Sequence, residues 1–144
     1  MLVAENQNTL PDIKHTILLH APIQKVWERV STAEGMALWF MPSDMQPILG
    51  HDFHLQTPFC SSPCKLMELE SPNRLSFTWD TEGWVVSFIL DELGEQTQFT
   101  LVHGGWKQSD EILPKANEKS SVIRARMEQG WVGILENLRK ALES

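Results

Sequence analysis

The residues of this chain whose types could do chemistry are few and lie in separate segments. His51, Asp52 and His54 are side chains of the kinds that bind transition metals. In an extended segment, alternate residues face opposite sides, so Asp52 and His54 share a face that His51 does not. A protein metal site needs three or four ligands, and no third residue is evident. We therefore expect neither a bound metal nor a cofactor.

The two cysteines are the next candidates for chemistry. Cys64 follows Cys60 four positions later, a spacing that matches neither the redox Cys-x-x-Cys motif nor a zinc knuckle. In a cytosolic protein, we expect both to be free thiols. A regulatory disulfide across the turn at Pro63 is the alternative.

Two further side chains could act on a bound molecule. His103 shares the face of a predicted strand with Phe99 and Leu101, so it could serve as an acid, a base or a hydrogen-bond donor to a ligand. Arg124 lies about 20° from Trp131 on a helical wheel and could bind an anionic head group. A structural contact for His103 and a solvated helix start for Arg124 are the alternatives. We identify no catalytic residue from the sequence.

The segment that opens the fold is a strand followed by two helices. Alternation of apolar and polar residues predicts a strand over Asp12–His20. Pro22 fits the first position of a helix, and Ser31 with Glu34 forms a capping box for a second helix that runs to about Phe40. The first helix has one apolar face, made by Ile23, Val26, Trp27 and Val30.

The middle of the chain alternates in the manner of an antiparallel meander. Weak strand signals over Met45–Thr57 are interrupted at Gly50. The predicted strands that follow are Lys65–Glu70, Arg74–Asp80, Trp84–Asp91 and Gln96–His103. The polar segment Gly104–Lys119 shows no periodicity and is predicted to be a loop.

A long helix is predicted from about Ser120 to Leu142. Its apolar stripe recurs at 100° per residue, and Glu136 and Lys140 are spaced to pair on the polar side. The stripe consists of Ile123, Met127, Trp131, Ile134, Leu135, Leu138 and Leu142. The predicted class is therefore α+β.

The whole-chain properties limit the partners. With 144 residues, the chain is expected to form one domain, residues 1–144, with an ordered core over about 12–142 and a loose, polar Met1–Leu10. The net charge of −7 argues against nucleic acid and anionic membrane surfaces as partners. The N-terminus lacks the pattern of a signal peptide, so we expect a cytoplasmic protein.

Three motifs carry a family resemblance. They are Ala21-Pro22-x-x-x-Val26-Trp27 running on to Leu38-Trp39, then Thr100-Leu101-Val102-His103-Gly104-Gly105-Trp106, and finally Gly130-Trp131-x-x-x-Leu135-x-x-Leu138. In this order the chain resembles the START-like superfamily, also called SRPBCC or Bet v-like, from about Ile13 to Leu142. Within it, the chain is most similar to homologues of the activator of the heat-shock-protein ATPase.

The resemblance implies a helix-grip fold. In such a fold about six antiparallel strands form a curved sheet, two short helices follow the first strand, and the C-terminal helix crosses the concave face. A ligand cavity would lie between that helix and the sheet, with a filled core as the alternative. The residues that would line the cavity are Trp39, Phe40, Met41, Phe53, Phe77, Trp79, Phe99, Leu101, His103, Arg124, Met127, Trp131 and Leu135.

Three functions follow as expectations. The first is non-enzymatic binding of a small hydrophobic or amphipathic molecule in that cavity. The second, implied by the resemblance, is a protein-interaction module that contacts a chaperone. The third is a cyclase- or hydrolase-like enzyme that uses His103 in the same cavity.

Overall fold

The computed structural model describes residues 9–57, 61–81, 83–114 and 116–143. Its elements run in the order strand, two helices, seven strands and one long helix. They are β1 (Ile13–Leu19), α2 (Ile23–Ser31), α3 (Ala33–Trp39), β2 (Asp52–Gln56), β3 (Ser61–Glu70), β4 (Arg74–Trp79), β5 (Trp84–Leu93), β6 (Gln96–Gly104), β7 (Ile112–Leu113), β8 (Glu118–Lys119) and α4 (Ser120–Glu143). This confirms the predicted α+β class.

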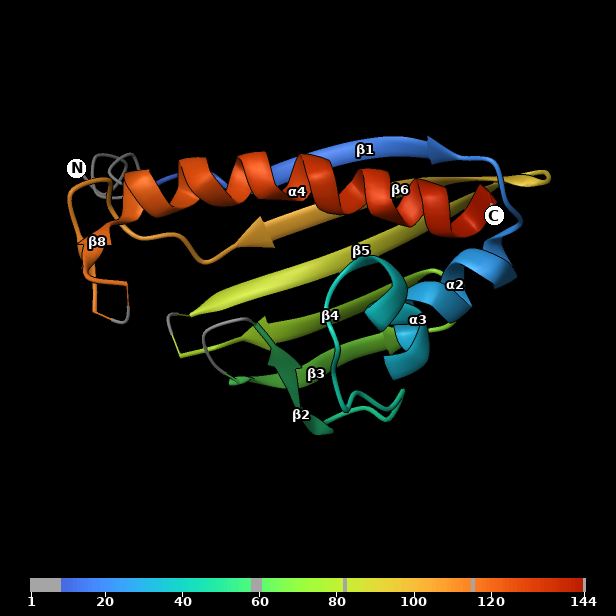
Figure 1. Cartoon of the computed structure of the whole chain (residues 1–144), viewed down its shortest axis with the longest axis horizontal. Helices are drawn as coiled ribbons and strands as arrows, with labels where there is room; N and C mark the ends of the chain where they lie inside the picture. The colour runs from blue at the N-terminus through green and yellow to red at the C-terminus, as the bar shows by residue number, and fades with distance from the viewer. Residues whose placement is uncertain (1–8, 58–60, 82, 115, 144) are drawn as a thin grey trace, which may run out of the picture.

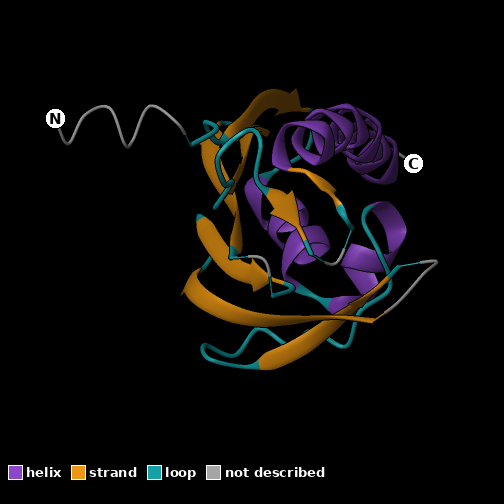
Figure 2. Ribbon diagram, turned by 90° about the vertical axis from the view of Figure 1, so that its left-hand side faces the viewer, coloured by secondary structure: helices purple, strands orange, loops and turns teal. Residues whose placement is uncertain are grey.

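Six strands form one antiparallel sheet in the order β1-β6-β5-β4-β3-β2. Strands β2 to β6 form the predicted meander. Strand β1 pairs with β6, so the strands that come first and last along the chain in this sheet lie side by side. The sheet curves around the helices, as Figure 2 shows end-on. In Figure 1, α4 runs along the direction of β1 and β6, and α2 and α3 lie near its C-terminal end.

Alternation along the strands determines which residues face the helices. In β4, Leu75, Phe77 and Trp79 are buried, and in β6 Phe99, Leu101 and His103 are buried. In β2, Phe53 and Leu55 occupy the same face. The inner face of the sheet is therefore apolar, and its buried residues form one continuous core with the helices.

Two segments differ most from the prediction. Strand β3 begins at Ser61 rather than Lys65, since its first residues pair with β2 over Gln56↔Ser61 to Asp52↔Lys65. The predicted loop Gly104–Lys119 contains the short pair β7–β8, whose register is Ile112↔Lys119 and Leu113↔Glu118. Two-residue strands are too short to show a period, so their alternation could not be recognised.

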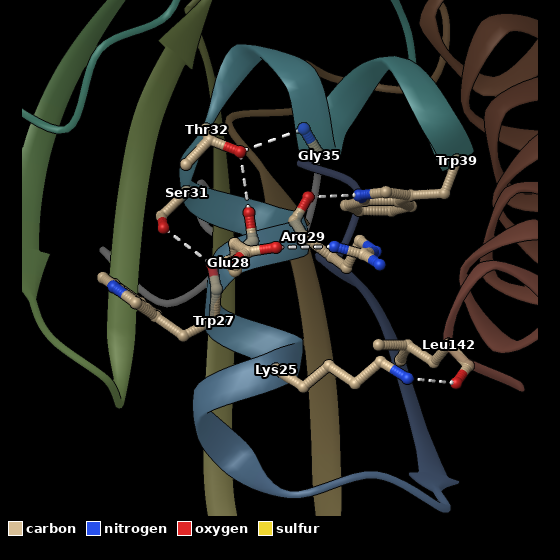
Figure 3. Close-up of polar contacts among 9 residues, drawn as sticks. All are labelled: Lys25, Trp27, Glu28, Arg29, Ser31, Thr32, Gly35, Trp39 and Leu142. Atoms are coloured by element: carbon tan, nitrogen blue, oxygen red, sulfur yellow. Dashed lines mark hydrogen bonds and ion pairs between the residues drawn. The ribbon is translucent and has the colours of Figure 1, made fainter.

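The predicted capping box of Ser31 and Glu34 is wrong, as the α2–α3 corner in Figure 3 shows. Ser31 is the last residue of α2, and its hydroxyl donates to the carbonyl of Trp27 at 2.6 Å. Thr32 caps α3 instead, because its Oγ1 accepts from the backbone N–H of Gly35 at 2.9 Å. The prediction failed by one position because Ser31 keeps its helical hydrogen bonding and Thr32 is the residue with extended backbone.

Helix α4 follows its predicted stripe closely. Ile123, Trp131, Leu135, Leu138 and Leu142 are buried, while Met127 and Ile134 are half-buried and pack against the core. Glu136 pairs with Arg139 at 2.8 Å rather than with Lys140 as predicted. No helix in the described part of the chain is long and apolar enough to cross a membrane.

Candidate functional site

Aromatic side chains from α3, α4 and the sheet meet beneath α4. Trp39 packs against Phe40, Phe88 and Phe99 with ring centroids 5.4, 5.4 and 6.2 Å apart. Phe40 also stacks on Trp131 of α4 at 5.2 Å. The indole N–H of Trp39 donates to the carbonyl of Arg29 at 2.8 Å, which fixes the ring over the α2–α3 corner (Figure 3).

The structure brings together most of the residues predicted to line a cavity. Phe77, Phe99, Leu101 and His103 have no surface that a water molecule can reach, and Phe53 and Trp131 have 1%. No space of the size of a water molecule therefore adjoins the first four. Trp39, Leu135 and Trp79 are nearly as buried, at 2%, 4% and 6%. Phe40, Met41 and Met127 are half-buried and pack against the margin of this core.

His103 sits inside a ring of four tryptophans. The centroid of its imidazole is 4.8 Å from that of Trp106, 5.0 Å from Trp84, 5.7 Å from Trp79 and 6.0 Å from Trp131. These residues come from β4, β5, β6, the segment after β6, and α4. We call His103 and these four residues the tryptophan cluster.

The hydrogen bonds of His103 define its protonation. The indole N–H of Trp131 donates to His103 Nδ1 at 3.0 Å, so Nδ1 is an acceptor and the single proton of the neutral ring is on Nε2. Burial, and secondarily the positive charge of Arg124, lowers the pKa of His103 to about 3. The ring is therefore neutral at physiological pH, and Nε2–H is a donor.

Two N–H donors of the tryptophan cluster have no acceptor. His103 Nε2 and Trp84 Nε1 are both buried without a hydrogen-bond partner among the described residues. Leaving a buried donor unpaired costs roughly 1–3 kcal/mol, so such groups are rare in stable cores. The cluster thus combines apolar walls with two unused donors.

The motif around His103 explains how Trp106 reaches the cluster. Gly105 has a φ of +89°, and a Cβ at this position would overlap the carbonyl oxygen of Gly83. Only glycine fits this turn. The chain then returns so that Trp106 Nε1–H donates to the carbonyl of His103 at 3.0 Å.

Arg124 contacts the protein's own backbone. Its Nε donates to the carbonyl of Pro11 at 2.8 Å, and a second guanidinium nitrogen donates to that of Asp12 at 3.3 Å. A third approaches Glu128 at 3.5 Å. The guanidinium therefore links the segment just before β1 to helix α4 by hydrogen bonds.

An open pocket lies where α4 meets β1, with a volume of about 170 Å³. We call it the seam pocket. It is lined by His15, Thr16, Ile17, Val132, Leu135, Glu136 and Arg139. Of these only Leu135 was predicted as a lining residue. The alternation of His15 with Ile13 and Ile17 placed His15 on the inner face, and this signal could have found it.

The remaining candidates show no reactive site. Asp44, rather than Asp52, pairs with His54 at 3.3 Å. Among the described residues no group of three or more His, Cys, Asp or Glu is placed to hold a metal. Cys64 is a free thiol, and burial raises its pKa to about 12. Cys60 lies outside the described residues, as does Met1 to Asn8 of the predicted loose terminus.

Comparisons with solved structures support this fold. A Bacillus halodurans protein, BH1534, is 51% identical, with 94% of this chain and 99% of that chain covered and a TM-score of 0.88. At 20% identity, a Mesorhizobium loti protein has a TM-score of 0.75 over 90% of this chain and 96% of its own. The Aha1 dimer from Colwellia psychrerythraea is 18% identical, with a TM-score of 0.77 over 93% of this chain and 97% of that one.

Sequence comparison places the chain in a family. No curated protein matches its sequence. Residues 20–143 match the family model described as "Activator of Hsp90 ATPase homolog 1-like protein". This match spans α2, α3, the whole meander and all of α4, the orange-red helix in Figure 1. The chain therefore belongs to the family of Activator of Hsp90 ATPase homolog 1-like proteins.

Proposed function

We propose that this protein binds a small hydrophobic or amphipathic molecule, without catalysing a reaction, between α4 and the sheet. The observation that carries the proposal is the seam pocket, an open space bounded by β1 on one side and α4 on the other. A free thiol at Cys64 suits a reducing compartment, and we propose that the protein acts in the cytoplasm.

The lining of the seam pocket is amphipathic. Ile17, Val132 and Leu135 supply apolar surface. Polar groups come from Arg139 and from His15, whose buried Nε2 has no hydrogen-bond partner among the described residues. At about 170 Å³ the pocket is smaller than the roughly 300–1,000 Å³ of sites for drug-sized ligands. The geometry favours a short molecule, or one end of a longer molecule.

The state of His103 favours binding over catalysis. A general base works best when its pKa is near the working pH. The pKa of His103 is lowered to about 3, so the ring takes up almost no proton at neutral pH. The residue also has no surface open to solvent. The interior histidine is therefore a poor acid or base but a sound hydrogen-bonding group.

The experiment is an NMR titration of the ¹⁵N-labelled protein with hexanoate. Saturable shifts are expected at Thr16 and Ile17 in β1 and at Val132 and Glu136 in α4. Val132→Trp should fill the pocket and weaken binding about tenfold or more. Val122→Trp is the matched control, because Val122 is an exposed valine of the same helix that does not line the pocket. Equal affinity in the two variants would contradict the proposal.

A second function is favoured by the exposed Leu38 on α3. This side chain is 60% exposed and lines two adjoining hollows of about 330 and 420 Å³, one shared with α4 and one with the α2–α3 corner. An apolar side chain presented in a groove suits contact with another protein. The family description makes an Hsp90-type chaperone the partner to test.

The test of this second function is the ATPase rate of a purified Hsp90-type chaperone with and without the chain. Stimulation that Leu38→Asp abolishes would support it. Leu93→Asp is the control, since Leu93 is an apolar side chain of similar exposure in β5. An unchanged rate with the wild-type chain would remove this function.

A further inference from the structure

The unpaired N–H donors of the tryptophan cluster indicate which polar group a ligand would need. His103 Nε2–H and Trp84 Nε1–H are both buried, and both lack an acceptor among the described residues. Their rings are adjacent, with centroids 5.0 Å apart and planes at 76°. A carbonyl or carboxylate oxygen has two lone pairs, so a single oxygen between the rings could accept from both N–H groups.

We propose that the polar end of the bound molecule is a hydrogen-bond acceptor, a carbonyl or carboxylate oxygen, held by His103 Nε2–H and Trp84 Nε1–H. This rests on the proposed function and deepens it, because it names the chemical class of the ligand. The apolar part next to that oxygen would contact Trp131, which lies on α4 one helical turn before Leu135 of the seam pocket.

The tryptophan cluster is continuous with the seam pocket along two elements. On α4, Trp131 of the cluster lies one helical turn before Leu135 of the pocket. On β1, Ile13 is paired with His103, and His15, two residues further on the same face, lines the pocket. A molecule in the seam pocket therefore has the cluster as its next neighbour under α4.

Entry to the donors requires a side chain to move. His103 is fully buried, and Trp79 and Trp106 are nearly so. Trp84 is half-buried, and Phe40 and Met127 are half-buried beside Trp131. Because the indole N–H of Trp84 makes no hydrogen bond in the structure, displacing this ring breaks none.

The charges near the tryptophan cluster select against a cation. His103 is a donor only at Nε2, since Nδ1 is occupied by Trp131. Arg124 is close enough to His103 for its positive charge to be felt there. An ammonium group, itself a positively charged donor, could not pair with either unpaired N–H, and Nδ1 of His103 already accepts from Trp131.

The test compares three probes of equal chain length: hexanoate, 2-hexanone and hexylammonium. Each is titrated into ¹⁵N-labelled wild-type protein, and both the seam residues of β1 and α4 and the indole N–H signals are followed. We expect hexanoate and 2-hexanone to shift the Trp84 indole N–H downfield in a saturable way. Hexylammonium should bind about tenfold more weakly and leave that signal in place.

Two variants separate the donor from the packing. Trp84→Phe removes the unpaired N–H and should weaken hexanoate binding about tenfold, while hexylammonium binding is unchanged. Trp106→Phe is the matched control. It removes an indole N–H of the same cluster that is already bonded to the His103 carbonyl, so it should leave the hexanoate affinity within about twofold.

The outcomes are distinguishable. If hexanoate shifts the seam residues but not the Trp84 indole N–H, the acceptor site is wrong while the seam pocket stands. The same holds if all three probes bind equally. If none of the probes shifts any seam residue, the proposed function fails and the acceptor site fails with it. Since the wild-type titration alone decides these cases, a poorly folded variant would not prevent a decision.

Discussion

His103 shows how burial and one hydrogen bond set the chemistry of a residue. The imidazole accepts from Trp131 at Nδ1 and is surrounded by indole rings, so the charged form has neither water nor a counter-charge to stabilise it. Its pKa therefore falls to about 3. The residue works as a neutral hydrogen-bonding group rather than as a proton carrier.

This pKa predicts a pH dependence of stability. In the unfolded chain, His103 takes up a proton near pH 6.5, while the folded protein takes it up only near pH 3. Protonation between these values favours the unfolded state, so stability is complete above about pH 6.5 and falls as the pH falls. The loss from this one group should be about 1.4 kcal/mol per pH unit.

Urea unfolding of wild type and His103→Gln between about pH 7 and pH 4.5 measures this effect. Gln can accept from Trp131 but does not titrate, so the other histidines contribute equally to both curves. We expect the wild type to lose stability relative to the variant as the pH falls. Parallel curves would show that the folded protein binds the proton as readily as the unfolded chain.

At the scale of elements, the α2–α3 corner holds α4 in place as well as starting α3. Lys25 Nζ donates to the carbonyl of Leu142 at 3.0 Å, and Trp39 is fixed by the Arg29 carbonyl (Figure 3). Thr32 connects the two helices by donating to the Glu28 carbonyl and accepting from the Gly35 N–H. The corner thus positions the Trp39–Phe40 pair that packs against Trp131.

Thr32→Ala should destabilise the protein by about 1 kcal/mol, because it removes the N-cap of α3. Glu34→Ala should change the free energy of unfolding by less than about 0.5 kcal/mol, since Glu34 is exposed and is not part of the cap. Thermal and urea unfolding of the two variants measures both values. A larger loss in Glu34→Ala than in Thr32→Ala would restore the capping box that the sequence predicted.

Periodicity explains why the elements were predictable and their ends were not. Strands β4 and β6 and helix α4 each alternate or repeat over six or more residues, so their buried faces were predicted correctly from the sequence. The cap at Thr32 depends on which of two adjacent hydroxyl residues leaves the helix. Strand β3 begins early because of its pairing with β2, which is a contact distant in sequence.

The site was predictable only in part for a similar reason. Phe99, Leu101 and His103 share a face in any β-strand, so their burial follows from the local pattern. The seam pocket lies between α4 and β1, which are far apart in the sequence, so no local pattern predicts the space between them. The unpaired donors of His103 and Trp84 depend on the mutual orientation of two rings, and no spacing in the sequence encodes that orientation.

At the scale of the whole molecule, the fold is a curved sheet closed by one helix, with its aromatic core packed and its open space at the edge. The sheet wraps the helices (Figure 2), and β1, the first strand, is the edge that meets α4. The tightly packed aromatic residues hold the shape. Phe40, Met41 and Met127 are half-buried at the margin of that core.

The most direct test of ligand binding is native mass spectrometry of the protein purified without denaturation, before and after solvent extraction. The wild-type mass should exceed the chain mass by one small molecule and should return to the chain mass on extraction. Val132→Trp should carry much less of that molecule than Val122→Trp. A wild-type protein that shows only the chain mass, and that binds none of the three six-carbon probes at the seam pocket, would contradict ligand binding between α4 and the sheet.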